Sequence, residues 1–369
     1  MKAILFLAVF ALRVAYFFFK LFLKPKEKIT FLSRQSNTPS VDFEYLEKAI
    51  KAQGFKGEVK MLCKMIAPSL MGKIAYAFHI LAQMYHIATS RVVVIDGYNI
   101  AVCVLKHKKD QKFVQLWHAL NIVKKFGYGA LDKPWGHKSS TAKAMCMHKN
   151  YTHIIACSEA SGRVLCEFFG AERDKMVLLP LPRIEYILKS PQNHAAIKEA
   201  YPTVFEKPIL LYAPTFRGEQ VDLSWIEKTV DFGKYNVVVK LHPADKYGIA
   251  DKVDKRVICD ENFSSFEWMK VCDSLVTDYS GMGFEAMLRN KKVYYYLYDY
   301  KDYSQNNGLN LDLFSEEISP YVTENQDDLK RILEKEYDFS KIQKFTQKYL
   351  SVSTENCADQ LAQFIISLV

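Results

Sequence analysis

The stretch FVQLWHALNIVKKFGYG, residues 113–129, joins a short apolar run to a Trp-His pair and then to a segment with two lysines and two glycines. A run such as FVQLW is typical of a strand that is buried within a parallel sheet. A strand with a purely structural role has no need of an ionisable ring at its carboxyl end. His118 is therefore a candidate site residue, and the run before it points to an α/β fold.

Short apolar runs of this kind alternate with helical patterns on both sides of the proline-rich segment LPLPRIEY at residues 179–186. Before this segment, the runs that we interpret as strands are residues 29–33, 59–63, 91–96, 113–117, 153–158 and 176–180. After it, they are residues 208–214, 236–243, 256–260, 274–280 and 292–297. Buried strands that alternate with helices indicate a parallel, doubly wound sheet. Two such series predict two Rossmann-like domains that face each other across a cleft.

Two helices are indicated between the first strands. The sequence FEYLEKAIKAQG, residues 43–54, is typical of a short amphipathic helix that ends at a glycine. Six apolar side chains recur at helical spacing and predict a helix over residues 69–89: Leu70, Ile74, Ala77, Phe78, Leu81 and Tyr85. The expected divisions of the chain are a first segment 1–28, a domain 29–190, a domain 191–350, and a final helix in 351–369 that returns to the first domain.

The first segment, residues 1–28, is apolar over residues 3–23 and is long enough to span a bilayer, but Arg13 and Lys20 interrupt it. An aromatic cluster at residues 16–19, with cations before and after it, fits a helix that lies among lipid headgroups. A true span and a buried first helix are the alternatives. No small-residue cleavage site follows, which disfavours a signal peptide. We expect a membrane-associating helix with the rest of the chain on the cytoplasmic side.

Charge is unevenly distributed along the chain, whose formal net charge is +9. Residues 1–150 hold 24 Lys and Arg against eight Asp and Glu, so the excess of positive charge lies in this part. An anionic partner is indicated, which is a membrane surface, a polyphosphate or a nucleic acid. The cations are dispersed and no RNA-binding signature is present, so nucleic acid is the least favoured of the three.

Motifs that would indicate other chemistry are absent from the sequence. The eight cysteines form no CxxC pair and no Cys/His spacing typical of a zinc site, and we expect reduced, mostly buried thiols. There is no Walker loop, no GxGxxG and no DxD-type metal motif. We therefore expect no bound metal and no cofactor, with phosphate charge neutralised by helix dipoles and by arginine, lysine and histidine.

Polar residues follow the apolar runs at four places where a ligand is expected. In open α/β sheets, ligands bind outside the carboxyl ends of the strands. The four strand ends are LWHA (116–119), YAPTFRG (212–218), KLHPADK (240–246) and VTDYSGMGFE (276–285). Their convergence on one cleft predicts a binding site there.

Each of these motifs also has a purely structural interpretation. Ser280 can cap the helix that follows TDYS, where two glycines leave backbone N–H groups open to an anion, but an ordinary capped turn has the same sequence. His242 precedes a proline that ends its strand, and a single histidine is more often structural. Arg217 can pair with a phosphate or remain a surface cation.

Taken together, the motifs resemble the CDP-glycerol glycerophosphotransferase family of teichoic-acid biosynthesis. That family has WHG or WHA at a strand end, YxPTxR, a His-Pro dipeptide, and TDYSS followed by Phe and an acidic residue. Here the same order appears as LWHA, YAPTFR, KLHP and TDYSGMGFE, and it is followed by KKVYYYLYDYKDY. The resemblance runs over about residues 29–303 and is greatest to the primase-type members. Gly281 replaces the second serine of TDYSS, and Glu185 replaces an aspartate.

The resemblance implies a GT-B architecture at the cytoplasmic face of the cell membrane. It also implies transfer of glycerol phosphate, or ribitol phosphate, from a CDP-polyol to a hydroxyl of an undecaprenyl-diphosphate-linked disaccharide, with release of CMP. His118 and His242 are the implied catalytic residues, with His118 as the general base and His242 as a contact of the donor diphosphate. The other implied donor-binding residues, in residues 191–350, are Thr215, Arg217, Thr277, Asp278, Ser280, Gly281 and Glu285. The implied acceptor-binding residues, in residues 29–190, are Trp117, Lys124, Lys125 and Arg183.

Two alternatives remain at this point. One is a GT-B glycosyltransferase with a nucleotide-sugar donor and a lipid-linked acceptor. The other is a membrane-bound protein that binds nucleic acid or another anionic polymer, which the positive charge of residues 1–150 suggests and the dispersed cations disfavour. A solvated turn is the alternative for the lysines at residues 124 and 125.

Overall fold

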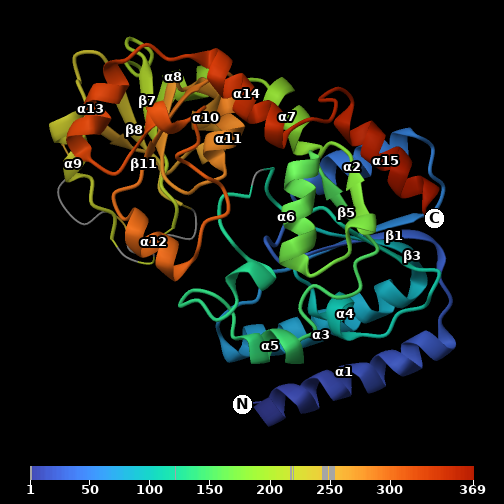
Figure 1. Cartoon of the computed structure of the whole chain (residues 1–369). Coiled ribbons are helices and arrows are strands. Elements are labelled where there is room, and N and C mark those ends of the chain that lie inside the picture. The colour runs from blue at the N-terminus through green and yellow to red at the C-terminus, as the bar shows by residue number, and fades with distance from the viewer. Residues whose placement is uncertain (1, 121, 217, 219, 243–247, 249–253) are drawn as a thin grey trace. The chain divides into compact units, whose positions relative to one another are not determined.

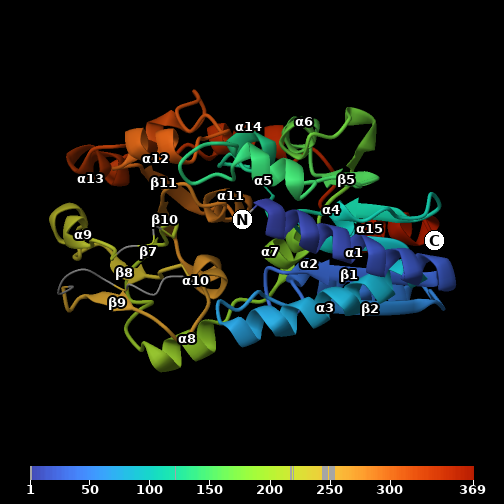
Figure 2. The same ribbon diagram turned by 90° about the horizontal axis from the view of Figure 1, so that it is seen from below.

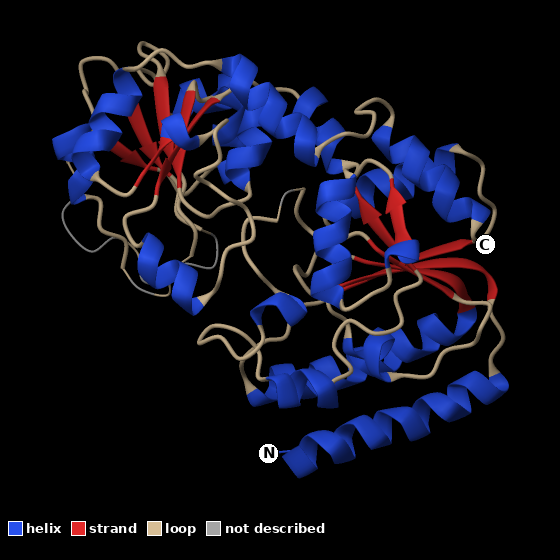
Figure 3. Cartoon of the chain, in the orientation of Figure 1, coloured by secondary structure: helices blue, strands red, loops and turns tan. Residues whose placement is uncertain are grey.

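The computed structural model describes residues 2–120, 122–216, 218, 220–242, 248 and 254–369, with side chains from residue 6 onward (Figure 1). The chain divides into two compact units, each with its own sheet and with helices on both faces of that sheet (Figure 3). Unit 1 consists of Met1–Leu120, Lys125–Tyr186 and Tyr349–Val369. Unit 2 consists of Asn121–Lys124 and Ile187–Lys348.

The sheet of unit 1 has six parallel strands in the order β2-β1-β3-β4-β5-β6. They are β1 (Lys26–Ser33), β2 (Glu58–Cys63), β3 (Ser90–Ile95), β4 (Lys112–Gln115), β5 (His153–Ala156) and β6 (Met176–Leu178). In the centre, Ile29 and Phe31 of β1 pair in register with Val92 and Val94 of β3, and all four side chains are fully buried. Helices cover both faces, which explains why the central strands carry buried, mostly apolar runs such as residues 29–32 and 92–95.

The helices of unit 1 are α1 (Lys2–Phe22), α2 (Val41–Ala52), α3 (Leu70–Thr89), α4 (Ile100–Val104), α5 (Ser139–Ala144), α6 (Glu159–Phe169) and α15 (Cys357–Ser367). The helix α7 (Arg183–Lys189) contains the division between the units. The last helix, α15, packs on α2 although it is far from it in sequence. The carboxylate of Glu185 accepts a hydrogen bond from the N–H of Ala358 at 3.1 Å, which helps to fix the start of α15.

The sheet of unit 2 is also parallel, in the order β12-β11-β10-β7-β8-β9. Its strands are β7 (Ile209–Tyr212), β8 (Asn236–Val239), β9 (Val257–Cys259), β10 (Ser274–Thr277), β11 (Lys292–Tyr296) and β12 (Val322–Thr323). Its helices are α8 (His194–Ala200), α9 (Ser224–Thr229), α10 (Ser265–Val271), α11 (Met282–Leu288), α12 (Tyr300–Asn306) and α13 (Gln326–Glu334), with most of α14 (Phe339–Tyr349). The predicted α/β class with two parallel sheets is confirmed.

Helix α1 packs along one side of unit 1, against α3, α4 and α5 (Figures 1 and 2). Its Val9 and Tyr16 are buried, and the Arg13 guanidinium donates to the carbonyl of Val104 at 2.9 Å. The helix ends at Phe22 and β1 begins at Lys26, so the expected segment 1–28 includes the start of the first strand. Among the helices that the structure describes, none has both the length and the apolarity needed to cross a membrane.

Candidate functional site

In unit 1, the order of the strands reverses between the neighbouring strands β1 and β3, which flank this switch point. His118 follows β4, which lies beside β3. The chain leaves β3 at Asp96 and leaves β4 towards His118. The imidazole Nδ1 of His118 is 2.9 Å from the backbone carbonyl oxygen of Asp96. A switch point at the carboxyl edge is where α/β sheets bind ligands, so His118 occupies a position suited to chemistry.

The bond to Asp96 determines which nitrogen of His118 carries the proton. A carbonyl oxygen can only accept, so Nδ1–H is the donor and Nε2 keeps its lone pair. The ring reaches solvent, but protein surrounds its other sides, and this desolvation lowers its pKa to about 4. The bond to Asp96 opposes the shift, and the positive charge of Arg183 adds to it. At neutral pH the ring is uncharged and can accept a proton at Nε2.

Gln115 holds the turn that presents His118. Trp117 has a φ of 61°, a left-handed conformation that non-glycine residues rarely adopt. The buried amide of Gln115 bridges this turn to its neighbour, because its Oε1 accepts from the N–H of Trp117 at 2.9 Å and its Nε2 donates to the carbonyl of Gly97 at 3.1 Å. The indole of Trp117 stacks on Phe126 with ring centroids 4.0 Å apart. The strained turn at Trp117 is therefore held by the hydrogen bonds of Gln115 and by the stacking on Phe126.

Arg183, expected to bind the acceptor, contacts both His118 and a buried carboxylate. Its guanidinium donates to the carbonyl of His118 at 2.6 Å and to Asp42 at 2.5 and 2.7 Å, while its own N–H donates to Asp42 at 2.8 Å. Asp42 is 1% exposed, so this is a well-enclosed ion pair. Sequence reasoning missed Asp42, because nothing in its local sequence in α2 indicates a partner in residues 179–186.

Asp96 is a second residue that sequence reasoning missed, although it ends one of the runs interpreted as strands. Its carboxyl is 3% exposed, and burial, together with the nearby charge of Asp42, raises its pKa to about 6. A bond with Ser33 and the charge of Arg183 act in the opposite direction. The signal that could have found it is its place, since it follows β3 at the switch point.

In unit 2, two of the sequence motifs meet at the second switch point. Strands β7 and β10 are neighbours there, and YAPT includes the end of β7 while TDYS includes the end of β10. The N–H of Thr215 donates to Asp278 Oδ1 at 2.9 Å, and the hydroxyl of Thr277 donates to the carbonyl of Ala213 at 2.7 Å. Thr277 and Asp278 are 0% and 1% exposed. The side chains of Thr277 and Asp278, both expected to bind the donor, therefore hold the two motifs together through buried hydrogen bonds.

The turn after TDYS differs from its expected form. The N-cap of α11 is Gly281 rather than Ser280, and the Ser280 hydroxyl accepts from the N–H of Met282 at 3.3 Å. The N–H groups of Gly283 and Phe284 donate to backbone carbonyls inside the turn, at 3.4 and 3.1 Å. The expectation of open N–H groups for an anion is therefore wrong at these three residues, because the short helix uses them itself.

The two glycines of this turn have different surroundings. A side chain at Gly283 would meet the hydroxyl of Tyr295 at 2.4 Å, so this glycine permits α11 to pack on β11. Nothing lies within 4 Å of the corresponding position at Gly281, which borders open space. Glu285, in the first turn of α11, is 9% exposed. Of these residues, Gly281 is the one that a ligand can approach most closely.

Lys124, expected to contact the acceptor, belongs to unit 2 and lies beside the YAPT motif. Its ammonium donates to the hydroxyl of Thr215 at 3.3 Å and lies 5.7 Å from the ring centre of Tyr303. Tyr303 stacks on Tyr279 of TDYS, with centroids 3.9 Å apart. A positive charge is therefore placed among the donor motifs. Lys125 belongs to unit 1 and is half-buried.

His242 lines a pocket of about 480 Å³ at the carboxyl ends of β8 and β9. Its side chain is exposed, and its ring centre is 6.0 Å from that of Phe216. The segment that connects β9 to α10 also lines this pocket, through residues that include Phe263 and Ser264. The expected contact Arg217 lies outside the described residues. Within the described part of the chain, no group of three or more His, Cys, Asp or Glu is arranged to hold a metal ion.

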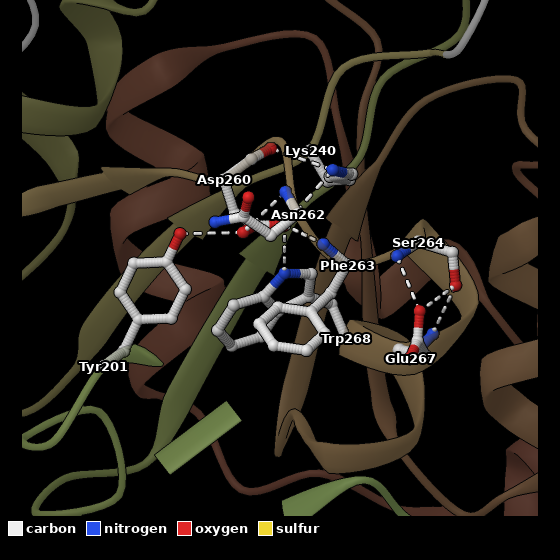
Figure 4. Close-up of polar contacts among 8 residues, drawn as sticks. All are labelled: Tyr201, Lys240, Asp260, Asn262, Phe263, Ser264, Glu267 and Trp268. Carbon is white, nitrogen blue, oxygen red and sulfur yellow. Dashed lines mark hydrogen bonds and ion pairs between the residues drawn. The ribbon is translucent and has the colours of Figure 1, made fainter. Parts of the chain in front are cut away.

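A buried network around Asp260 shapes the wall of this pocket (Figure 4). The Asp260 carboxylate accepts from Tyr201 at 2.7 Å and from the indole of Trp268 at 2.9 Å, and it forms a 3.1 Å ion pair with Lys240. Burial acts to raise the pKa of Asp260, but the hydrogen bonds, led by that from Trp268, outweigh it and lower the pKa to about 2. The carboxylate therefore stays charged at any pH near neutrality and fixes Lys240 at the end of β8.

Comparison with protein families gives a match over almost the whole chain. The model of the family described as CDP-Glycerol:Poly(glycerophosphate) glycerophosphotransferase matches residues 14–367. The teichoic acid ribitol-phosphate primase of Bacillus spizizenii is 28% identical over 358 residues, which cover 93% of this chain and 92% of that protein. The teichoic acid glycerol-phosphate primase of Bacillus subtilis is 26% identical over 373 residues, which cover 95% of each.

Solved structures with the same fold also match. The structure of the wall teichoic acid polymerase TagF aligns with a TM-score of 0.68 and 14% identity, covering 99% of this chain and 96% of that chain. A UDP complex of MnaA from S. aureus aligns with a TM-score of 0.53 and 11% identity, covering 93% of this chain and 98% of that one. At these identities the likeness concerns the fold, and it agrees with the expected relation to GT-B enzymes.

Proposed function

Since this chain belongs to the CDP-glycerol:poly(glycerophosphate) glycerophosphotransferase family and is a phosphotransferase of teichoic-acid biosynthesis, we propose that it transfers a polyol phosphate from a CDP-polyol to a lipid-linked acceptor. The donor is CDP-glycerol or CDP-ribitol, and the acceptor is a hydroxyl of an undecaprenyl-diphosphate-linked disaccharide. The observation that carries this proposal is His118, an accessible neutral imidazole whose Nδ1–H is held by Asp96. Its free Nε2 suits it to take a proton from a hydroxyl.

In the proposed reaction, the acceptor hydroxyl oxygen attacks the phosphorus that carries the polyol. A new oxygen–phosphorus bond forms, the bond between this phosphorus and the bridging oxygen of the diphosphate breaks, and CMP leaves with that oxygen. The hydroxyl proton passes to Nε2 of His118. Arg183 and Gln115 keep the imidazole in place through the backbone on either side of it. No protein nucleophile is needed, because positioning and stabilisation of charge supply most of the rate in phosphoryl transfer.

The donor site that we propose lies in unit 2. The pocket beside His242 has a volume suited to a nucleoside, and His242 stands at its edge to contact the diphosphate. Lys124 adds a positive charge next to Thr215, so we now place it with the donor phosphates instead of the acceptor. The open space at Gly281 leaves room for the polyol phosphate between these groups.

We place the enzyme on the cytoplasmic face of the cell membrane, held by two neighbouring helices of unit 1 (Figure 2). One face of α1 is exposed and apolar, through Phe6, Leu7, Phe10, Val14, Phe17, Phe18, Leu21 and Phe22. The adjoining helix α3 exposes Leu70, Met71, Ile74, Phe78, Leu81 and Tyr85. Exposed apolar patches of this extent mark interaction sites. Together these side chains form what we call the apolar face, which fits a peripheral or monotopic enzyme.

Placing charge on the apolar face is expected to release the protein from membranes. We expect the double variant Phe10→Asp/Phe17→Asp to partition into vesicles about 100-fold less than wild type, because two exposed aromatic side chains no longer enter the lipid. Flotation with lipid vesicles measures the effect. Leu178→Asp/Phe314→Asp, at exposed apolar positions elsewhere, is the control and is expected to float like wild type. Equal flotation of the two double variants would reject the apolar face as the membrane contact.

Product analysis tests the reaction itself. The protein is incubated separately with CDP-glycerol and CDP-ribitol, together with a short-chain lipid-linked disaccharide, and the products are measured by mass spectrometry. We expect CMP and an acceptor that has gained one or more polyol phosphates with at least one of the donors. A hexose adduct from a nucleotide-sugar, with no product from either CDP-polyol, would contradict the proposal and support the glycosyltransferase alternative.

A further inference from the structure

A pocket of about 490 Å³ lies in unit 1 between α1 and the segments that follow α4 and α5. Four cationic side chains line it, namely Arg13, Lys20, Lys106 and Lys149. They come from three segments that are distant in sequence, so the cluster is a product of the fold. We call this site the α1 basic pocket. It is distinct from His118 and from the pocket beside His242, and nothing in the proposed reaction uses it.

The pocket carries positive charge without compensation. None of the residues that line it is acidic, and within the described residues none of its four cations forms an ion pair with a carboxylate. Lys106 and Lys149 are exposed to solvent and Lys20 is half-exposed. Like charges gathered in one concave site repel one another, and an anion bound among them removes that repulsion. The pocket is therefore complementary to a phosphate group.

Contacts around the pocket hold α1 in place before any ligand arrives. The buried hydroxyl of Tyr16 donates to Nδ1 of His107 at 3.1 Å, since Nε2 of His107 donates to the carbonyl of Val102 at 2.7 Å. The Arg13 guanidinium is fixed by its bonds to the carbonyl of Val104 at 2.9 Å and to Cys146 Sγ at 3.5 Å, and it lines the pocket. A site that is already formed loses little entropy when it binds.

The position of the pocket indicates which kind of phosphate-bearing ligand it can bind. Phe17 lines it and is also part of the exposed apolar face. A ligand seated there has its phosphate among cations and its remaining part beside side chains that enter lipid. We infer that the α1 basic pocket binds the headgroup phosphate of an anionic phospholipid such as phosphatidylglycerol. This inference rests on the proposed membrane association and adds to it a specific lipid class.

Flotation of the full chain with vesicles of two compositions tests the inference. The vesicles contain phosphatidylcholine alone or phosphatidylcholine with phosphatidylglycerol. We expect Lys106→Gln/Lys149→Gln to lose about 25-fold in binding to the second composition, because each lysine near an anionic surface contributes about fivefold. Binding to phosphatidylcholine alone is expected to stay unchanged. The control is Lys109→Gln/Lys143→Gln, which removes the same charge at exposed positions that do not line the pocket.

The outcomes distinguish phospholipid binding in the pocket from diffuse electrostatic attraction and from binding of the lipid-linked acceptor. An equal loss in both double variants would overturn the inference, because it would show diffuse attraction to the whole basic surface. A loss that appears with vesicles containing a polyprenyl diphosphate, but not with phosphatidylglycerol, would also overturn it and would make the pocket an acceptor site. Titration with dihexanoyl-phosphatidylglycerol below its micelle concentration needs no bilayer. Saturable binding to wild type but not to Lys106→Gln/Lys149→Gln would therefore support the pocket even if α1 proved not to dock on membranes.

Discussion

Replacing His118 by alanine is expected to lower kcat by about 100- to 10,000-fold, the usual contribution of a general acid–base residue. The loss is expected because no other described imidazole near this switch point has its Nδ1–H held by a backbone carbonyl and its Nε2 free. Release of CMP in the presence of a water-soluble acceptor measures the rate. His153→Ala, at the beginning of β5 in the same unit, is the matched control and is expected to keep kcat close to wild type.

The pH profile of the wild type provides a second check on His118. Its pKa is lowered to about 4, mainly by desolvation, so the ring is neutral and active as a base above that value. As the pH falls through this range the ring becomes protonated, and we expect kcat/KM, which reports groups of the free enzyme, to fall with it. A rate for His118→Ala similar to that of wild type, with the same pH profile, would show that His118 is structural.

Replacing His242 by alanine is expected to affect the donor as well as the rate. A charge-assisted hydrogen bond to the diphosphate contributes about 1.5–3 kcal/mol, so we expect the KM for the CDP-polyol to rise by about 10- to 150-fold, together with a lower kcat. Because His242 is exposed, its loss is not expected to unfold unit 2. Steady-state kinetics with varied donor measures the change, and His194→Ala, an exposed histidine at the start of α8, is the control.

The positions of the strands along the chain could be predicted from the sequence because the buried strands of a parallel sheet carry short apolar runs. Each of the eleven expected runs overlaps a strand, and the expected runs extend too far mainly at their carboxyl ends. At those ends, as at residues 157–158 and 278–280, the chain has already left the sheet. Strand β12 was not expected, because two residues are too short to give a pattern.

The direction in which helix α3 faces could not be predicted from its periodicity. The six apolar residues that predict this helix do lie on it, but five of them rank among its exposed large side chains. Its buried side is formed by other residues, including Tyr76, Met84 and Gln83. A periodic pattern shows that a helix has an apolar stripe, and it does not distinguish a stripe that faces a core from one that faces a membrane.

The motifs located the candidate site, but not the contacts that support it. His118, Thr215 and His242 stand at strand ends, where the sequence places them. Asp42 is separated from Arg183 by 141 residues, and its bond to Arg183 depends on how α2 and α7 pack. The role of Gln115 depends on the left-handed backbone at Trp117, which no local pattern reveals. Such contacts are a product of the tertiary structure and cannot be derived from spacing.

Calorimetric titration of CDP-glycerol and CDP-ribitol into wild type, His118→Ala and His242→Ala tests the central claim most directly, namely that unit 2 binds the donor while His118 of unit 1 acts as the base. The account predicts that wild type and His118→Ala bind at least one of the two donors equally well and that His242→Ala binds it about 10- to 150-fold more weakly. Loss of binding in His118→Ala with normal binding in His242→Ala would contradict the claim. So would a wild-type protein that binds neither donor.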